Sequence, residues 1–315
     1  MATGKPQRRH HYVPEFYLKR WQLGGDRLLE FSRPVPNRPD VRYRWVSPKQ
    51  TGYVDKLYYL DHLPEHLRNG YEDRFFTPVD MKASRVLDRF ERGNFETDSA
   101  QRSSWARFIM SLTFRTPETI QAIRRELERD IFNPTRESER SYRRRRRPHD
   151  PRTLRAALEQ ERNDDDLNHV ALQVSTGLAD SQKIGERLIN TVWGFRHMPL
   201  NAPALLTSDR PLVWAFSMDD PQFHIVLPTG PKTLFWAART PRMVSTLQNT
   251  EGAHLVRFMN EHVTRRAVQY VWGASLRQQQ YVQQFMGVDP EHTIPDTLIE
   301  QRWAMLKRRE RRARR

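Results

Sequence analysis

The sequence contains no cysteine. A chain without thiols cannot form disulfides, bind zinc through thiolates or use a cysteine nucleophile. It also lacks any apolar run approaching the ~18 residues of a membrane-spanning helix. The first thirty residues contain no apolar signal-peptide core. We therefore expect a cytoplasmic protein without a membrane span.

Familiar catalytic signatures are missing as well. There is no glycine-rich phosphate loop, no Gly-x-Ser-x-Gly nucleophile elbow and no His-Glu-x-x-His zinc helix. Whether the chain is an enzyme therefore stays open at this stage. The same absences are the main support for a non-catalytic protein-interaction module.

Positive charge is abundant but confined to short segments. The net charge is +15. Residues 136–152 contain eight arginines against three acidic residues, and residues 301–315 contain eight basic residues against Glu310. Residues 1–20 add five basic residues against Glu15, which leaves the rest of the chain close to neutral. Concentrated basic segments are typical of polyanion-binding proteins, so nucleic acid is the expected partner, ahead of an anionic membrane surface. Arginine-rich ends that only keep the protein soluble are the alternative.

Hydrophobic periodicity divides the chain into two β-rich stretches around a helical middle. Short apolar or alternating runs predict strands over 28–32, 41–46, 53–60, 193–197, 204–207, 212–216, 223–227 and 233–238. Apolar residues at helical spacing predict helices over 15–21, 77–91, 98–112, 116–131, 166–191 and 252–272. This order predicts an α+β fold in which a helical bundle packs against a small, mostly antiparallel sheet.

We expect residues 10–290 to form a single α+β domain, with a boundary near residue 150 as the alternative. It would lie between a disordered basic N-terminus at 1–9 and a basic C-terminal helix or tail at 291–315. The five arginines from Arg143 to Arg147 repel one another and predict a disordered Arg-rich loop over 136–152. The residues expected to contact phosphate in the loop and tail are Arg144, Arg145, Arg146, Arg308 and Arg309.

The first candidate site is the run from Arg9 through His10 and His11 to Pro14. Adjacent histidines point to opposite sides of a regular element, so one can face a cleft while the other packs. An imidazole with an ordinary pKa of about 6.5 can act as a metal ligand or a general base. The alternative is an N-cap and packing cluster at the start of the first helix.

A second candidate is Asp209, which follows a predicted strand and precedes Pro211. Its carboxylate could hold a divalent metal, orient a histidine or cap its own turn. Arg115 lies at a joint between two helices, where it can hold a phosphate or pair with a carboxylate across the bundle. Glu72 and Asp80 flank a helix start, where acidic residues favour the helix dipole for structural reasons.

The motif His10-His11-Tyr12-Val13-Pro14-x-Phe16-Tyr17-Leu18 resembles the opening of a widespread, mostly bacterial family, catalogued as domain of unknown function 4238. Further similarities follow in order: Arg115-Thr116-Pro117, Thr207 to Pro211, Leu227-Pro228 with Pro231, and Asn260 in a helix that closes on Tyr270. The resemblance covers roughly residues 8–272. It assigns no chemistry, but it raises the weight on His10, His11, Asp209 and Asn260 as a group.

These observations support two functional hypotheses besides the interaction module. The first is a nucleic-acid-associated protein whose Arg-rich loop and tail bind the phosphate backbone. The second is a phosphoester hydrolase or nuclease, in which His10 or His11 acts with Asp209 as base or metal ligand while Arg115 or Lys232 steadies the phosphate. Under this hypothesis we expect His11 and Asp209 to approach each other, because both lie at the ends of elements, where side chains can converge on a cleft.

Overall fold

The computed structural model describes residues 9–22, 24–33 and 40–289. The predicted N-terminal segment up to residue 8 and the predicted tail with Arg308 and Arg309 lie outside the described residues. The described part confirms an α+β fold, with a helical middle between two β-rich stretches. None of its helices combines the length and apolar character that crossing a bilayer requires.

Strands of the described residues form three antiparallel sheets rather than the single small sheet that the sequence predicts. The first pairs β1 (Arg9–His11) with β4 (Tyr53–Asp55). The second has the order β3 (Arg42–Val46), β2 (Leu28–Ser32), β10 (Tyr270–Gly273), β6 (Thr207–Ser208). The third has the order β5 (Val192–His197), β9 (Thr233–Ala238), β8 (His224–Gly230), β7 (Val213–Ala215). Both β-rich stretches of the chain therefore contribute to the second sheet.

The two central strands of the third sheet, β8 and β9, are buried on both faces. In β8 and β9 the side chains alternate between two hydrophobic cores, as the period of two in a strand dictates. Leu227 and Phe235 face a core with α1 (Glu15–Leu18), α2 (Thr77–Glu91) and α3 (Ser99–Phe114). Val226 and Leu234 face a core with α9 (Pro241–Asn249), α10 (Gly252–Arg265) and α11 (Gln279–Phe285). One sheet thus joins the N-terminal helices to the C-terminal ones.

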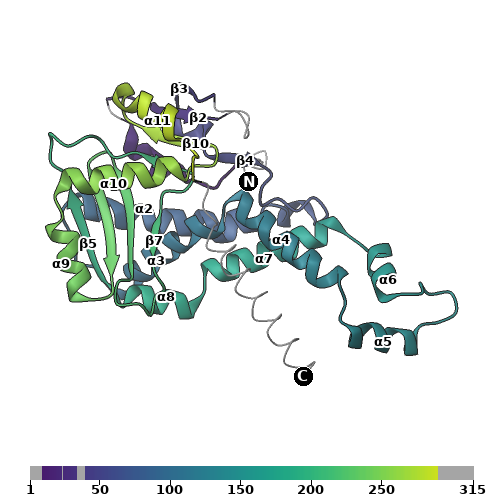
Figure 1. Cartoon of the computed structure of the whole chain (residues 1–315). Helices are drawn as coiled ribbons and strands as arrows, with labels where there is room; N and C mark the ends of the chain where they lie inside the picture. Colours follow the sequence, from purple (N-terminus) through teal and green to yellow (C-terminus); the bar gives the residue numbers. More distant parts are fainter. Residues whose placement is uncertain (1–8, 23, 34–39, 290–315) are drawn as a thin grey trace.

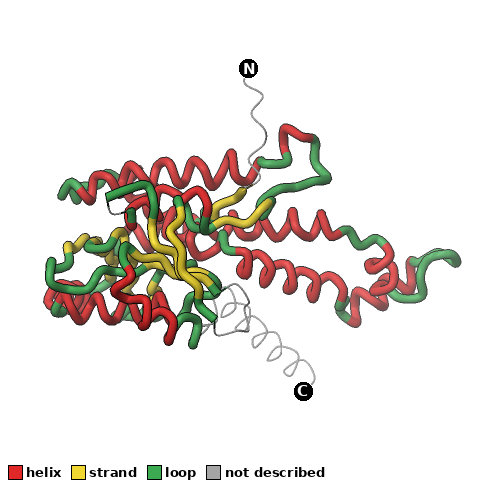
Figure 2. Tube along the Cα trace, turned by 90° about the horizontal axis from the view of Figure 1, so that it is seen from above, coloured by secondary structure: helices red, strands yellow, loops and turns green. Residues whose placement is uncertain are grey.

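Two long helices project from this body as an arm, here called the helical arm (residues 117–179). Helix α4 (Pro117–Phe132) runs beside α7 (Asp164–Ala179), and the two bury Ile120, Ile123, Ala171 and Leu172 near the body. Helices α5 (Arg136–Arg145) and α6 (Leu154–Gln160) lie at the far end of the arm (Figures 1 and 2). They bury no side chain, so the arm tip displays its polar residues to solvent.

Three sequence-based assignments differ from the structure. The Arg-rich loop predicted over 136–152 is largely helical, because Thr135 caps the N-terminus of α5 while the arginines of the last turn face the negative end of the helix dipole. The helix predicted over 252–272 ends at Arg265, since Val271 and Trp272 pair with β2 and β6 instead. The helix predicted over 166–191 breaks after α7, and α8 (Gln182–Ile189) begins a new helix.

Candidate functional site

The N-terminal motif is held rigidly by its neighbours. Strand β1 pairs with β4 so that His11 lies opposite Tyr53. The carbonyl of Gly52 accepts the N–H groups of both Tyr12 and Val13, at 3.0 and 3.1 Å. Gly52 has a φ of +66°, and a Cβ there would lie 3.2 Å from the Val13 carbonyl oxygen, so this turn requires glycine.

His10 and His11 face opposite sides of this strand. The Nδ1 atom of His10 accepts the N–H of Tyr58, and Nε2 bonds to Asn69 Oδ1, both at 2.7 Å. Its ring also stacks on Tyr58, with centroids 5.2 Å apart. Both ring nitrogens of this fully buried histidine are therefore engaged, and His10 has a packing role.

His11, in contrast, lines a cavity of about 480 Å³ beside α1 and α2. Its Nε2 atom is buried without a hydrogen-bond partner in the described structure, and the nearest acidic oxygen, Glu15 Oε1, is 3.8 Å away. Burial, reinforced by the positive charge of Arg115, lowers the pKa of His11 to about 4. The imidazole is therefore neutral at physiological pH, and its buried Nε2 atom has no hydrogen-bond partner in the described structure.

Glu72 also lines this cavity, although the sequence predicted only a structural role for it. It begins a π-helical turn (η4, Glu72–Phe76) that runs directly into α2, and such turns are frequent at functional sites. One oxygen accepts the Thr77 hydroxyl at 3.3 Å, whereas Oε2 is buried without a partner. Burial raises the pKa of Glu72 to about 7, against the opposing effect of Arg115. The carboxyl group therefore exchanges its proton near neutral pH.

Arg115 connects two residues that line the cavity, His11 and Asp80. Its fully buried guanidinium pairs with both oxygens of Asp80, at 2.7 and 3.0 Å, and donates to the His11 carbonyl oxygen at 2.7 Å. Of the two roles that the sequence left open for Arg115, the structure places it in a bidentate ion pair across the bundle. Two cationic side chains, Lys19 and Arg85, line the cavity and form no ion pair within the described part of the chain.

The carboxylate of Asp209 binds the distant segment that leads into β10, and not its own turn. Its carboxylate accepts three backbone N–H groups, from Val268, Gln269 and Tyr270, at 2.6 to 3.0 Å. The side chain is almost completely buried. Both carboxylate oxygens are therefore occupied, and none of the described hydrogen bonds or ion pairs joins Asp209 to His11. The pKa of the neighbouring Tyr12 is raised mainly by burial, and the charge of Asp209 raises it further. The predicted His11–Asp209 pair has no direct contact to support it.

Asn260 and Lys232 also have structural roles. The amide of Asn260 accepts the N–H of Leu206 and donates to the carbonyl of Ala204, at 2.8 and 2.9 Å. The ammonium of Lys232 donates to three backbone carbonyls of the segment 199–202. Each side chain fixes the course of the loop that leads into β6, and neither reaches the cavity of His11.

The first three motifs of the family resemblance nevertheless meet in space. Arg115 joins the second motif to the first through the His11 carbonyl. Arg210 joins the third motif to α4, donating to Glu118 at 2.8 Å. These contacts are buried or part-buried, so the motifs form a joint between the N-terminal segment, the helices and β6.

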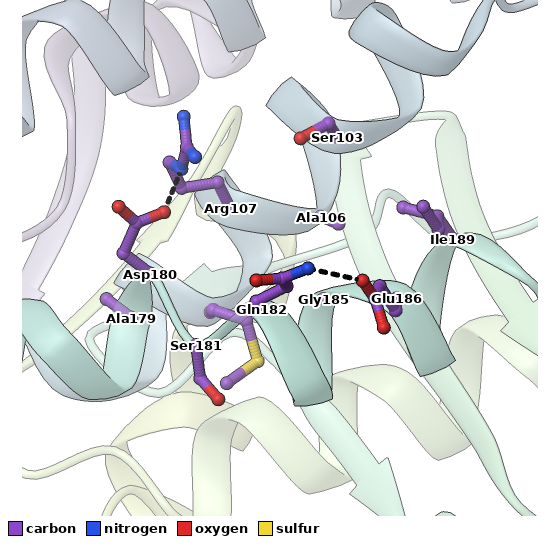
Figure 3. A pocket seen from close by; sticks show the side chains of 11 residues that line it. Ser103, Ala106, Arg107, Ala179, Asp180, Ser181, Gln182, Gly185, Glu186 and Ile189 are labelled. Atoms are coloured by element: carbon purple, nitrogen blue, oxygen red, sulfur yellow. Dashed lines mark hydrogen bonds and ion pairs between the residues drawn. The ribbon is translucent and has the colours of Figure 1, made fainter.

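A second cavity, of about 440 Å³, lies between α3 and α8 (Figure 3). Its charged groups are already engaged, since Arg107 pairs with Asp180 and Gln182 donates to Glu186. No unpaired buried polar atom lines it among the described residues. It is therefore a weaker candidate for chemistry than the cavity of His11 and Glu72.

No group of three or more His, Asp or Glu side chains in the described ranges is arranged to hold a metal ion. The predicted divalent metal therefore finds no ligand set there. The arginines predicted to contact phosphate divide by position. Arg145 donates a hydrogen bond to the Ser141 hydroxyl, and Arg146, at the C-terminal end of α5, donates one to the Asp150 carbonyl. Arg144 is exposed on the helix and forms no ion pair within the described structure.

Comparison with protein-family models identifies the family of this chain. The model described as "protein of unknown function (DUF4238)" covers residues 9–276, which includes the three motifs, the cavity and the helical arm. Searches of the curated proteins and of the solved structures found no match to the chain.

Proposed function

The chain belongs to this family of proteins of unknown function, and we propose that it binds nucleic acid through the phosphate backbone, with the tip of the helical arm as the contact surface. A single observation carries the proposal. Arg136, Arg140 and Arg144 repeat at intervals of four along α5 and are exposed, and none forms an ion pair within the described structure. This spacing places three free guanidinium groups on one helix face.

The position of α5 supports a polyanion as the ligand. It lies at the far end of the helical arm, away from the body (Figure 1). Guanidinium groups bind phosphate oxygens in a bidentate manner, and an exposed row of them matches the regular charge of a nucleic-acid backbone. A merely solvated charged helix is the competing explanation.

Salt-dependent binding separates these explanations. The variant with Arg136, Arg140 and Arg144 all changed to Gln would be compared with a control that changes Arg92, Arg242 and Arg257, which are exposed on the body. Fluorescence anisotropy with a labelled duplex should show a salt slope smaller by about 2.7 for the arm variant, because each lost phosphate contact removes about 0.9. Equal slopes for the arm variant, the control and the unmodified protein would refute binding through α5.

A second candidate function is phosphoester hydrolysis, and a specific observation favours it. The cavity of His11 and Glu72 combines two unpaired buried polar atoms with the free cations Lys19 and Arg85 at its lining. Acid–base chemistry on an anionic substrate can use an imidazole and a carboxyl group beside cationic side chains. The hydrolase proposed here uses Glu72, in place of His10 and Asp209.

Incubation with a labelled single-stranded oligonucleotide and with bis(p-nitrophenyl) phosphate tests this second function. Release of shortened fragments or of nitrophenolate by the purified chain, lost in a His11→Gln variant of unchanged melting temperature, is the expected result. Lack of turnover of both probes leaves the protein as a binding or interaction module.

A further inference from the structure

We infer that His11 and Glu72 divide the proton transfers of phosphoester hydrolysis between them, with His11 as the general base and Glu72 as the general acid. This inference rests on the second function proposed above and deepens it by naming the role of each residue. The substrate class is a phosphoester whose leaving group is an alcohol, such as a nucleoside hydroxyl. An alcohol needs a proton as it leaves, which a simple phosphate-binding pocket cannot supply.

The first support is the geometry of the two free atoms. Nε2 of His11 and Oε2 of Glu72 are both buried without hydrogen-bond partners in the described structure, and both residues line one solvent-open cavity. Each residue is more than nine-tenths buried. Unpaired buried polar atoms cost ~1–3 kcal/mol each, so two of them on residues that line one cavity point to a ligand that supplies the missing partners.

The second support is that each side chain is held at its other atom. The backbone of Pro48 interacts with the His11 ring, whereas Nε2 has no hydrogen-bond partner in the described structure. The Thr77 hydroxyl donates to Oε1 of Glu72 and leaves Oε2 to carry the exchangeable proton. Arg115 is a positioning residue, because it joins the backbone of His11 to Asp80 on α2.

The third support is the protonation state that the surroundings impose. His11 is faced by Arg115, Arg9 and His10, which together with burial keep it neutral, and by Glu15 at 3.8 Å. Glu72 is faced by Arg115, Asp80 and Asp73, and burial outweighs the cation. With a pKa of about 4 for His11 and about 7 for Glu72, the base is free and the acid is protonated over the same interval, from about pH 4 to 7.

The step balances without a redox partner. A water molecule attacks phosphorus and gives one proton to His11 Nε2, while the bond from phosphorus to the leaving oxygen breaks. Glu72 transfers its proton to that oxygen, which departs as an alcohol. Water then returns the proton from His11 to Glu72, and Lys19 and Arg85 offset the charge of the phosphate.

Two probes with different leaving groups test the division of roles. p-Nitrophenolate leaves without a proton, whereas the alcohol of an oligonucleotide must receive a proton as it leaves. Glu72→Gln should therefore slow oligonucleotide hydrolysis by about 10²–10³-fold and hydrolysis of bis(p-nitrophenyl) phosphate by less than about tenfold. His11→Gln should slow both. Glu186→Gln, in the second cavity, is the control and should change neither.

The pH dependence gives an independent readout in the unmodified protein. Its kcat/KM for the oligonucleotide should fall above about pH 7 as Glu72 ionises, and that decline should be absent for the nitrophenyl ester. Equal slowing of both probes by Glu72→Gln, or no slowing of either, overturns the assignment while hydrolysis itself stands. Lack of turnover of both probes by the unmodified protein overturns the hydrolase proposal together with it.

Discussion

Glu72→Gln should stabilise the protein at alkaline pH, whatever its function. The folded structure raises the pKa of Glu72 to about 7 from an ordinary 4.5, so the fold retains a proton that the unfolded chain releases in this interval. Stability from this group is therefore fully present below about pH 4.5 and is lost as the pH rises to 7. A difference of this size corresponds to about 3 kcal/mol, at ~1.4 kcal/mol for each pKa unit.

Glutamine keeps the shape of the side chain and the acceptor for Thr77 but cannot ionise. The variant and the unmodified protein should be nearly equal in unfolding free energy at about pH 4.5, and the variant should be more stable by about 2–3 kcal/mol at about pH 8. Urea unfolding followed by the fluorescence of the eight tryptophans measures this. The exposed Glu186→Gln serves as the control. A difference that does not change with pH would show that Glu72 ionises normally and would remove the basis for its role as an acid.

Three further predictions concern other parts of the chain. Asp209→Asn should lower the free energy of unfolding by about 2–4 kcal/mol in thermal or urea melts, because an amide cannot accept the same three N–H groups; an unchanged melting temperature would reopen a functional role for Asp209. Limited trypsin digestion should cut first between Arg143 and Arg147, where the arm tip buries no side chain, and first cleavage elsewhere would contradict this. Deletion of residues 307–315, outside the described structure, should flatten the salt dependence of duplex binding by up to about 3.6 if it removes ~4 phosphate contacts, without lowering the melting temperature.

Much of the fold could be predicted because local pattern and tertiary environment agree. Helix α2 has the predicted bounds, since its apolar residues form one face and Pro78 suits the first turn. Strand β9 matches as well, although both its faces are buried. The segment after Arg265 could not be predicted in this way. Ala267 and Val271 fit a helical spacing, but pairing with β2 and β6 satisfies the backbone of residues 270–273 as a strand.

The helical arm shows how charge can mislead a prediction of disorder. Five consecutive arginines favour a solvated loop when only their repulsion is considered. In the structure Thr135 accepts the N–H of Ser138, Glu139 pairs with Arg143, and the arginines of the last turn lie at the negative end of the helix. Capping, pairing and dipole terms of ~0.3–1 kcal/mol each add up along one short helix. The arginine run alone therefore did not determine the conformation of this segment. Its capping residue Thr135 and its ion-pair partner Glu139 favour the helix.

The candidate site was harder to predict because its key group looked ordinary. Glu72 stands at a helix start, where an acidic residue normally has a structural explanation, and only the fold shows that Oε2 is buried and unpaired. The strongest sequence signals were those of His10, His11, Asp209 and Arg115. In the structure, however, the polar atoms of His10, Asp209 and Arg115 form hydrogen bonds within the joint between segments. A motif made of such residues marks where distant parts of the chain meet. The two atoms left without partners beside that joint, His11 Nε2 and Glu72 Oε2, are the ones that the proposed hydrolysis would use.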